Sequence, residues 1–277
     1  MKNKYIAYLG LIYLLFSPVA VLAQEGNVSA VLSREISNGK TLDIFPFLPT
    51  VQLPLGISAH FFMLLLSAGL ILSLFFYGKR HLALKPRGLL VVLENMIGFV
   101  QEDIVFPIMG EAKGEKWLPF FCTLFLFLLT SNLLGLIPCF KTATGNINVT
   151  SALAAMILIL VFSVGIKSLG TFRFFKNFFP AGVILPIGIF VAFLEFTGLF
   201  LKTAILSLRL FSNMFAGHLA IFSFLMLIFI LSPMAGIFAV PFTVFTYLLE
   251  VIVGFIQAFV FTLLSCIFIT MASSVHE

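Results

Sequence analysis

Long apolar runs, separated by short polar segments, follow one another along the chain after residue 55. A helix that crosses a membrane needs about 20 consecutive, mostly apolar residues. Three runs close to this length lie at 56–77, 117–140 and 149–166, and two longer runs follow at 180–231 and 237–272. The pattern therefore predicts an all-α polytopic membrane protein with about five membrane-embedded helices.

The segment 88–106 has a different pattern and predicts a helix of another kind. It mixes leucine, valine and isoleucine with four polar residues, Glu94, Gln101, Glu102 and Asp103. Amphipathic helices of this kind lie in the interface of a membrane. Basic residues are concentrated at 79–87, just before it, and such clusters mark the cytoplasmic side. We therefore expect one amphipathic helix on the cytoplasmic surface, with Pro107 and Gly110 ending it.

The last two runs are longer than one perpendicular crossing requires. The sequence Ser-Pro-Met-Ala-Gly at 232–236 separates them, and this is a strong helix-breaking turn. Helices that exceed the membrane thickness tilt, kink or lie partly in the membrane plane. We therefore expect 180–231 and 237–272 to form a long, tilted hairpin within one membrane domain that covers 56–277.

The first 23 residues have the three parts of a secretory signal. Lys2 and Lys4 form a basic start, residues 5–16 are apolar, and small residues precede a cleavage site after Ala23. This pattern predicts a signal peptide at 1–23, followed by an extracytoplasmic segment at 24–55. The alternative interpretation is an uncleaved first membrane span.

Composition supports this fold class and excludes several functions. Charged residues make up 10% of the 277 positions, whereas soluble domains are about 25% charged. The net charge of +5 comes from short basic clusters between apolar runs, which set topology and do not indicate a nucleic-acid partner. The three cysteines have no CxxC spacing, so we expect no disulfide, metal ion or cofactor. No HExxH, Walker or GxSxG pattern occurs, so the chain is predicted to carry no catalytic site of its own.

Four charged residues fall inside the last two apolar runs: Glu195, Lys202, Arg209 and Glu250. Each costs roughly 2.5–3.5 kcal/mol at the centre of a membrane on insertion scales, so the four together cost about 10 kcal/mol. An ionisable residue inside a membrane is a functional candidate by default. For Lys202 the structural alternative is pairing with Glu195 or reaching the membrane interface.

Three of these residues recur every seven positions, and Asn213 lies four beyond Arg209. At 100° per residue, Glu195, Lys202, Arg209 and Asn213 lie within about 40° of one line along the helix. They therefore form a polar stripe on one face of the predicted helix at 180–231.

The last run carries a second polar stripe, with spacings of three, four and three residues, formed by Tyr247, Glu250, Gly254 and Gln257. Folding the hairpin about residue 233 brings Gln257 level with Arg209. It also brings Glu250 level with His218. Counting residues along two regular helices therefore predicts a guanidinium–amide layer and a separate imidazole–carboxylate layer.

The two layers suit different tasks. Arginine keeps its proton at any accessible pH, so Arg209 offers a fixed positive charge that attracts a carboxylate. Histidine and glutamate both exchange protons, so His218 and Glu250 suit a proton relay. A hydrogen-bonded interior histidine is the structural alternative for His218, and hydrogen bonds that join helices are the alternative for Gln257 and Asn213.

Three segments resemble the ATP synthase subunit a family. The sequence LSLRLFSNMFAGH at 206–218 is similar to the signature of that family and contains Arg209. The sequence FIQAFVFTLLSCIFI at 255–269 resembles its last helix. SNLLGLIP at 131–138 and GNINVT at 145–150 resemble its central hairpin. The resemblance covers most of the chain after residue 23, with matching order.

This resemblance implies roles for individual residues. Arg209 matches the essential arginine that faces the ion-carrying carboxylate of a rotating c-ring. His218 and Glu250 match positions that line an outer half-channel. Further positions associated with the ion path are Glu195, Asn213 and Gln257. Apart from this resemblance, Lys202, Tyr247 and Ser212 are candidates for a structural or channel-lining role.

The resemblance also implies a place in an assembly. The chain would be the stator subunit of the membrane sector of an F-type ATP synthase, coupling proton translocation to c-ring rotation and ATP synthesis. Its partners would be the c-ring, subunit b of the peripheral stalk, the catalytic head and membrane lipid. The sequence does not distinguish protons from sodium ions. The expected location is the bacterial inner membrane, with the N-terminus outside and the C-terminus in the cytoplasm; the alternative is the mitochondrial inner membrane.

Two other functions are alternatives. A free-standing ion-coupled secondary transporter is also rich in buried charge, but such proteins usually contain internal repeats, and none is detectable here. An intramembrane metalloenzyme needs clustered ligands, but the four histidines are 21, 137 and 58 residues apart. One of them, His60, lies at the outer end of the first predicted span and is expected at the membrane interface.

Overall fold

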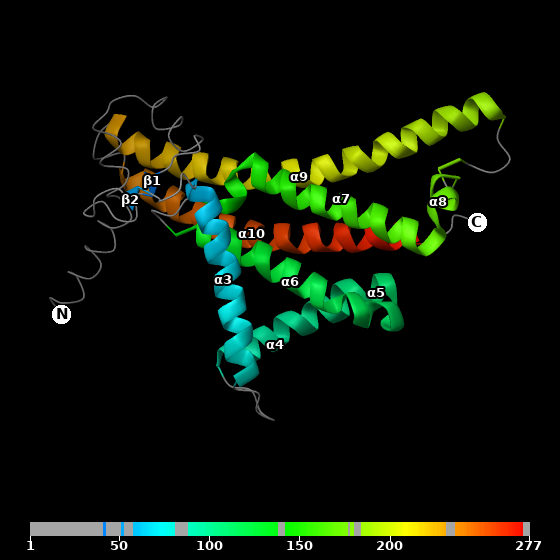
Figure 1. Ribbon diagram of the computed structural model, residues 1–277. Coiled ribbons are helices and arrows are strands. Elements are labelled where there is room, and N and C mark those ends of the chain that lie inside the picture. Colours follow the sequence, from blue (N-terminus) through cyan, green and yellow to red (C-terminus); the bar gives the residue numbers. More distant parts are fainter. Residues whose placement is uncertain are drawn as a thin grey trace. The chain divides into compact units, whose positions relative to one another are not determined.

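The computed structural model describes residues 41–42, 51–52, 58–80, 88–137, 142–176, 178–179, 184–230 and 236–273 (Figure 1). Several predictions from the sequence lie outside these residues. They are the signal peptide at 1–23, most of the segment 24–55, the last residues of 117–140, the first residues of 180–231 and the turn at 232–235.

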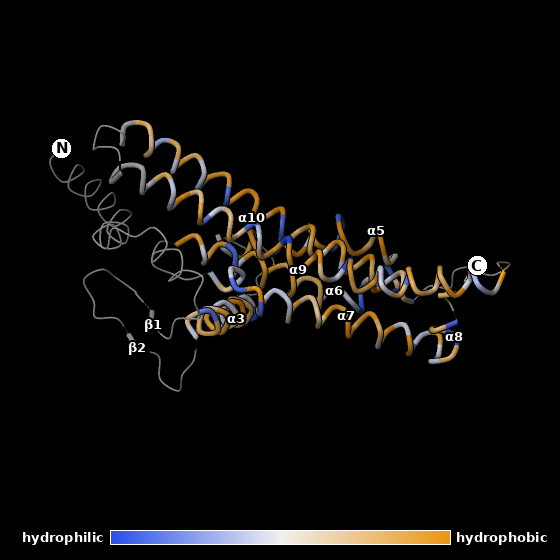
Figure 2. The backbone as a smooth tube through the Cα atoms, turned by 90° about the horizontal axis from the view of Figure 1, so that it is seen from above, coloured by the Kyte–Doolittle hydropathy of each residue, from blue (hydrophilic) through white to orange (hydrophobic). Residues whose placement is uncertain are grey.

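Five helices in the described part of the chain are long and apolar enough to cross a membrane. They are α3 (Ala59–Arg80), α6 (Glu111–Gly135), α7 (Ile147–Leu169), α9 (Leu185–Ile230) and α10 (Gly236–Ser273). Figure 2 shows that hydrophobic positions dominate these helices. The predicted all-α polytopic fold class is therefore confirmed.

The last two helices are the longest. α9 has 46 residues and α10 has 38 residues, whereas a perpendicular crossing needs about 20. Pro241 is the sixth residue of α10 and lies inside the helix, where its missing N–H leaves the carbonyl oxygen of residue 237 without its usual helical donor. The prediction of two overlong helices at the end of the chain is confirmed.

The segment between α3 and α6 is helical but interrupted. α4 (Leu89–Phe99) continues into a π-helical turn (Val100–Val105) and then into α5 (Phe106–Met109). The sequence predicted that Pro107 would end this helix, but the helix continues through it. Pro107 lies in the first turn of α5, where proline is tolerated. Gly110 ends it with a φ of 72°, a conformation that favours glycine.

A short helix, α8 (Thr171–Lys176), and a small antiparallel pair of strands, β1 (Thr41–Leu42) and β2 (Val51–Gln52), were not predicted. Gly170 separates α7 from α8 with a φ of 80°, so the chain reverses after α7 and α8 packs beside it (Figure 1). A side chain at Gly165 of α7 would overlap the ring of Phe174. A glycine at this position therefore lets α8 lie directly on α7.

The chain divides into two compact units whose boundaries fall within α3, α6, α9 and α10. The first consists of Met1–Leu70, Leu129–Asn146 and Phe211–Phe255, and the second of Ile71–Leu128, Ile147–Leu210 and Ile256–Glu277. Met63 and Met214 are fully buried in the first unit. Phe121, Phe125 and Phe261 are fully buried in the second. Each unit is described separately below.

Candidate functional site

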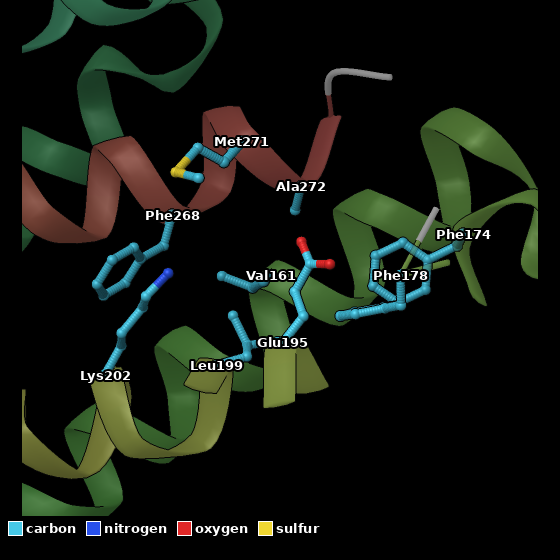
Figure 3. Close-up of a pocket in the computed structure, with 9 residues that line it drawn as sticks. All are labelled: Val161, Phe174, Phe178, Glu195, Leu199, Lys202, Phe268, Met271 and Ala272. Atoms are coloured by element: carbon cyan, nitrogen blue, oxygen red, sulfur yellow. The ribbon is translucent and has the colours of Figure 1, made fainter. Parts of the chain in front are cut away.

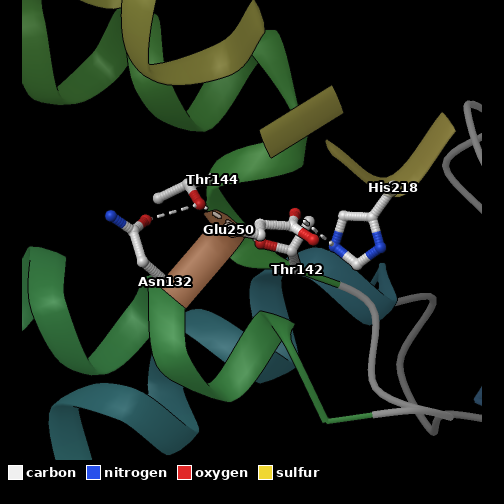
Figure 4. A network of polar contacts seen from close by, with 5 residues as sticks. All are labelled: Asn132, Thr142, Thr144, His218 and Glu250. Atoms are coloured by element: carbon white, nitrogen blue, oxygen red, sulfur yellow. Dashed lines mark hydrogen bonds and ion pairs between the residues drawn. The ribbon is translucent and has the colours of Figure 1, made fainter. Parts of the chain in front are cut away.

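His218 of α9 and Glu250 of α10 meet in the first unit (Figure 4). The His218 Nε2 and Glu250 Oε1 atoms are 4.0 Å apart, and the side chains are 23% and 3% exposed. Counting residues from the turn placed these two at the same level, and the observed distance agrees with that prediction. A nearly buried carboxylate therefore lies beside an imidazole that still reaches the surface.

The polar atoms of this pair have unused hydrogen-bonding capacity. Both carboxylate oxygens of Glu250 and the Nε2 atom of His218 are buried and make no hydrogen bond with any described residue. The same holds for the Nδ2 atom of Asn213, in the same unit. A buried polar atom without a partner costs about 1–3 kcal/mol. Three side chains with this property in one unit indicate a site that takes up small polar species.

Gly217 makes room for the Glu250 carboxylate. An ideal Cβ atom at position 217 would lie 2.6 Å from the Glu250 Cδ atom and would overlap its Oε1 atom. Any larger residue at this position would therefore push the carboxylate away from its place beside α9. Sequence reasoning missed Gly217, although it precedes His218 and lies close to the level predicted for Glu250.

A chain of buried hydrogen bonds reaches α10 one helical turn from Glu250. The Asn132 side-chain amide of α6 donates to the Gly254 carbonyl oxygen at 3.0 Å. The Thr144 hydroxyl donates to the Asn132 Oδ1 atom at 3.0 Å, and the Thr142 and Thr144 hydroxyls are 3.2 Å apart. Figure 4 shows these three residues together with the His218–Glu250 pair. Sequence reasoning had used this segment only as evidence of resemblance.

His60 of α3 lies at the other end of this chain. Its Nδ1 atom is 2.9 Å from the Thr142 carbonyl oxygen, and the residue is 4% exposed. His60, which the sequence placed at the outer end of the first span, is buried against the segment that follows α6. Its position in the sequence, at the start of an apolar run, did not reveal a partner 82 residues away.

Arg209 and Gln257 both belong to the second unit and are half-buried. Counting placed them level, but the two side chains form no hydrogen bond with each other or with any other described residue. The guanidinium group of Arg209 therefore keeps its donors available. The predicted guanidinium–amide contact is not formed in this structure.

Glu195 and Lys202 of α9 line one pocket of the second unit, with a volume of about 80 Å³ (Figure 3). The other residues around it are Val161 of α7, Leu199 of α9, Phe174 and Phe178 of the segment after α7, and Phe268, Met271 and Ala272 of α10. Both charged side chains are exposed and point into this space. They form no ion pair within the part of the chain that the structure describes. The structural alternative of a Glu195–Lys202 pair is therefore not observed.

The remaining candidates lie near these groups in the sequence. Ser212 is exposed, and Tyr247 and Asn213 are half-buried. Among the described residues, no three histidine, cysteine, aspartate or glutamate side chains come together as a metal site would require.

Comparison with known proteins adds independent information. A family model described as "ATP synthase A chain" matches residues 61–270. The chain is 37% identical over 267 residues to "ATP synthase subunit a" of Chlorobium phaeobacteroides (strain BS1), covering 91% of this chain and 78% of that protein. It is 38% identical over 224 residues to the protein of the same name from Myxococcus xanthus (strain DK1622), covering 79% and 74% of the two chains. The region matched by the family model includes Glu195, Lys202, Arg209, Asn213, His218, Glu250 and Gln257.

Proposed function

Since the chain belongs to the ATP synthase A chain family, as subunit a of the membrane sector of an F-type ATP synthase, we propose that it supplies two proton half-channels separated by Arg209. Family membership removes the free-standing transporter and the metalloenzyme from consideration. The single observation that carries the proposal is the His218–Glu250 pair, in which the His218 Nε2 atom and both Glu250 carboxylate oxygens are buried without a hydrogen-bond partner among the described residues.

The first half-channel passes His218 and Glu250. Proton transfer needs heavy atoms about 2.6–3.2 Å apart, or one bridging water, and polar atoms further apart than about 3.5 Å are commonly joined through water. The 4.0 Å separation between Nε2 and Oε1 suits such a bridge or a small closing movement. His218, which is partly exposed, receives the proton, and Glu250 passes it on toward the rotor. Asn213 offers a further donor in the same unit.

Arg209 separates this half-channel from the second one. Its guanidinium is permanently charged and has no partner within the described residues, so its charge is available for the ion-carrying carboxylate of the c-ring. Two unit charges about 4 Å apart attract each other by about 4 kcal/mol in a partly screened protein environment. This exceeds the roughly 2.5–3.5 kcal/mol cost of one charge in the membrane. Arg209 therefore holds the carboxylate ionised as it passes and blocks a direct proton leak.

The second half-channel uses the pocket of Glu195 and Lys202. A cavity needs about 10–15 Å³ to hold one water molecule, so a pocket of about 80 Å³ accommodates several. Both charged side chains face this space and neither is consumed by an ion pair with a described residue. Protons released from the rotor leave through this pocket, with Glu195 as the exchanging group.

The surroundings of the subunit follow from its apolar surface. Phe190, Phe193 and Leu201 of α9 are all more than half exposed in the isolated chain, and apolar surface of this extent requires lipid or a partner subunit to cover it. The c-ring, subunit b and the lipid bilayer of a bacterial inner membrane cover it, with the N-terminus outside and the C-terminus in the cytoplasm. The catalytic head connects through the stalks. A membrane potential of 100 mV supplies about 2.3 kcal/mol for each charge that crosses.

The decisive experiment replaces Arg209 in the complete complex. Arg209→Ala is expected to abolish ATP-driven proton pumping in inverted membrane vesicles while ATP hydrolysis by the membrane-bound head shows that the complex has assembled. Arg209→Lys is also expected to fail, because the ammonium group lacks the planar donor fork of the guanidinium. Retained pumping in Arg209→Ala would refute the assigned role of this residue. A Glu250→Gln variant that pumps normally would remove the assignment of the first half-channel.

A further inference from the structure

We propose that the hydrogen-bonded chain from His60 through Thr142, Thr144 and Asn132 to the Gly254 carbonyl holds Glu250 in place beside His218, with His60 as its anchor on α3. The members of this chain are positioning residues and carry no proton themselves. The inference rests on the proposed function in one respect, namely that Glu250 takes part in proton transfer.

All four side chains of this positioning chain are buried. His60 is 4% exposed, Thr142 7%, Thr144 1% and Asn132 0%. Polar groups are costly to bury unless their hydrogen bonds are made, and a connected network of them rigidifies the region that contains it. These hydrogen bonds join four parts of the first unit, namely α3, α6, the segment after α6, and α10.

The direction of each hydrogen bond follows from the chemistry of the groups. The Thr142 carbonyl can only accept, so His60 donates from Nδ1 and its neutral form carries the proton there. Thr144 gives its single proton to the Asn132 Oδ1 atom, so the Thr142 hydroxyl must donate to Thr144. Asn132 then donates from Nδ2 to Gly254. Each donor has one defined acceptor, so removing any one of them interrupts this series of hydrogen bonds. The Thr142 carbonyl oxygen also accepts from the Gly145 amide at 3.3 Å.

Two glycines hold the middle of the chain in place. An ideal Cβ atom at Gly135 would lie 2.5 Å from the Thr142 Cβ atom and 3.2 Å from its Cα atom. A Cβ atom at Gly145 would lie 2.5 Å from the Thr142 Cγ2 atom. Thr142 is therefore enclosed between the end of α6 and the turn before α7. This enclosure fixes the position of Thr142 and therefore of the hydrogen bonds that its carbonyl and hydroxyl groups make.

The hydrogen bond from Asn132 to the Gly254 carbonyl fixes the rotation of α10 about its own axis at the level of Glu250. Gly254 follows Glu250 by one turn on the same face of the helix. A rotation of α10 by about 20° moves an atom about 5.5 Å from the helix axis by roughly 2 Å. Such a shift would carry the carboxylate away from His218 or into the backbone at Gly217. The hydrogen bond from Asn132 to the Gly254 carbonyl resists that rotation.

The test uses pairs of variants in the complete ATP synthase, assayed for ATP-driven proton pumping per membrane-bound head. In His60→Asn the amide nitrogen takes the place of Nδ1 and keeps the donor, whereas His60→Leu removes it. Thr144→Ser keeps the hydroxyl, whereas Thr144→Val preserves the shape of the side chain without it. We expect pumping to fall about tenfold in the Leu and Val variants and to stay within twofold of wild type in the Asn and Ser variants. Both nonpolar variants interrupt the same series of hydrogen bonds. The double variant should therefore lose little more pumping activity than either single variant.

Three outcomes would overturn this inference. The first is wild-type pumping in His60→Leu or Thr144→Val, and the second is an equal loss in the conservative and nonpolar variants. The third is that none of the four variants assembles into the complex, because these hydrogen bonds would then maintain the fold rather than orient Glu250. The Glu250→Gln variant separates the two proposals. If it is inactive while His60→Leu pumps normally, only the positioning role fails, and if it pumps normally, the proposed first half-channel fails.

Discussion

Replacing Gly217 with alanine tests whether the position of the Glu250 carboxylate controls proton transfer. The substitution adds one methyl group on α9, in the place where the Glu250 side chain approaches the helix backbone. The added Cβ atom would lie 2.6 Å from the Glu250 Cδ atom and 3.1 Å from its Cγ atom. Non-bonded carbon atoms prefer separations of about 3.5–4.0 Å. The carboxyl group must therefore move by about 1 Å.

The fold should tolerate this movement. Overpacking costs about 1–3 kcal/mol, and alanine offsets about 1 kcal/mol of that because it favours the helical state over glycine. Folded domains are stable by about 5–15 kcal/mol, so the complex should still assemble. Proton transfer is more sensitive to geometry, since a misplacement of about 1 Å between reacting groups can lower a rate about 100-fold. We expect ATP synthesis to fall between about 10-fold and 100-fold.

The assay is ATP synthesis by the purified complex in liposomes after an imposed proton gradient, divided by the ATP hydrolysis of the same preparation. Gly69→Ala in α3 is the matched control, because an added Cβ atom there meets nothing within 4 Å. It should synthesise ATP at the wild-type rate. If Gly217→Ala does so as well, the argument that Glu250 requires the space at Gly217 is wrong. If both variants lose activity equally, general stiffening of helices explains the loss instead.

Three further predictions concern packing and access. Gly135→Ala should lower the thermal stability of the purified complex by about 1–3 kcal/mol, measured by its unfolding midpoint, because the new Cβ atom meets the backbone of Thr142. Leu199→Cys should react with a water-soluble thiol reagent because Leu199 lines the pocket and is half-buried, whereas Leu206→Cys, fully buried two turns later, should not. Ser207→Ala should cost about 0.6 kcal/mol for each helix-joining hydrogen bond lost, because the Ser207 hydroxyl contacts two hydroxyls of α7.

Each of these predictions has a contradicting result. An unchanged unfolding midpoint in the Gly135 variant would mean that the segment after α6 moves to accommodate the methyl group with no loss of stability. Equal labelling of the two cysteine variants would show that the pocket gives no special access to water. A Ser207 variant as stable as wild type would show that its hydroxyl contacts are replaced by others.

The local pattern of the sequence was sufficient to predict the membrane helices and the pairing of His218 with Glu250. Transfer of apolar side chains into lipid depends on composition over about 20 residues, so the sequence alone predicts the five long helices. The regular rise of a helix is also a local property. Counting from the turn at 232–236 therefore placed His218 level with Glu250, and their observed separation is 4.0 Å.

Local interruptions were predicted less well. Apolar periodicity predicts neither the π-helical turn before Pro107 nor the short helix α8. Each is too short to produce a clear period, and each depends on a neighbouring residue that breaks the regular helix. Gly170 separates α7 from α8 with a positive φ, and Pro107 lies two residues after the end of the π-helical turn.

Only the tertiary structure decided which polar residues beside Glu250 belong together. His60 bonds to a carbonyl 82 residues away, and Asn132 to one 122 residues away. The space that Gly217 leaves is likewise defined by a side chain on another helix. Hydrogen bonds and close approaches of this kind depend on the directions of side chains from separate elements, and a one-dimensional pattern contains no information about those directions. The sequence by itself determined which helices carry the charges, and packing determined how Glu250 is held and why a glycine faces it.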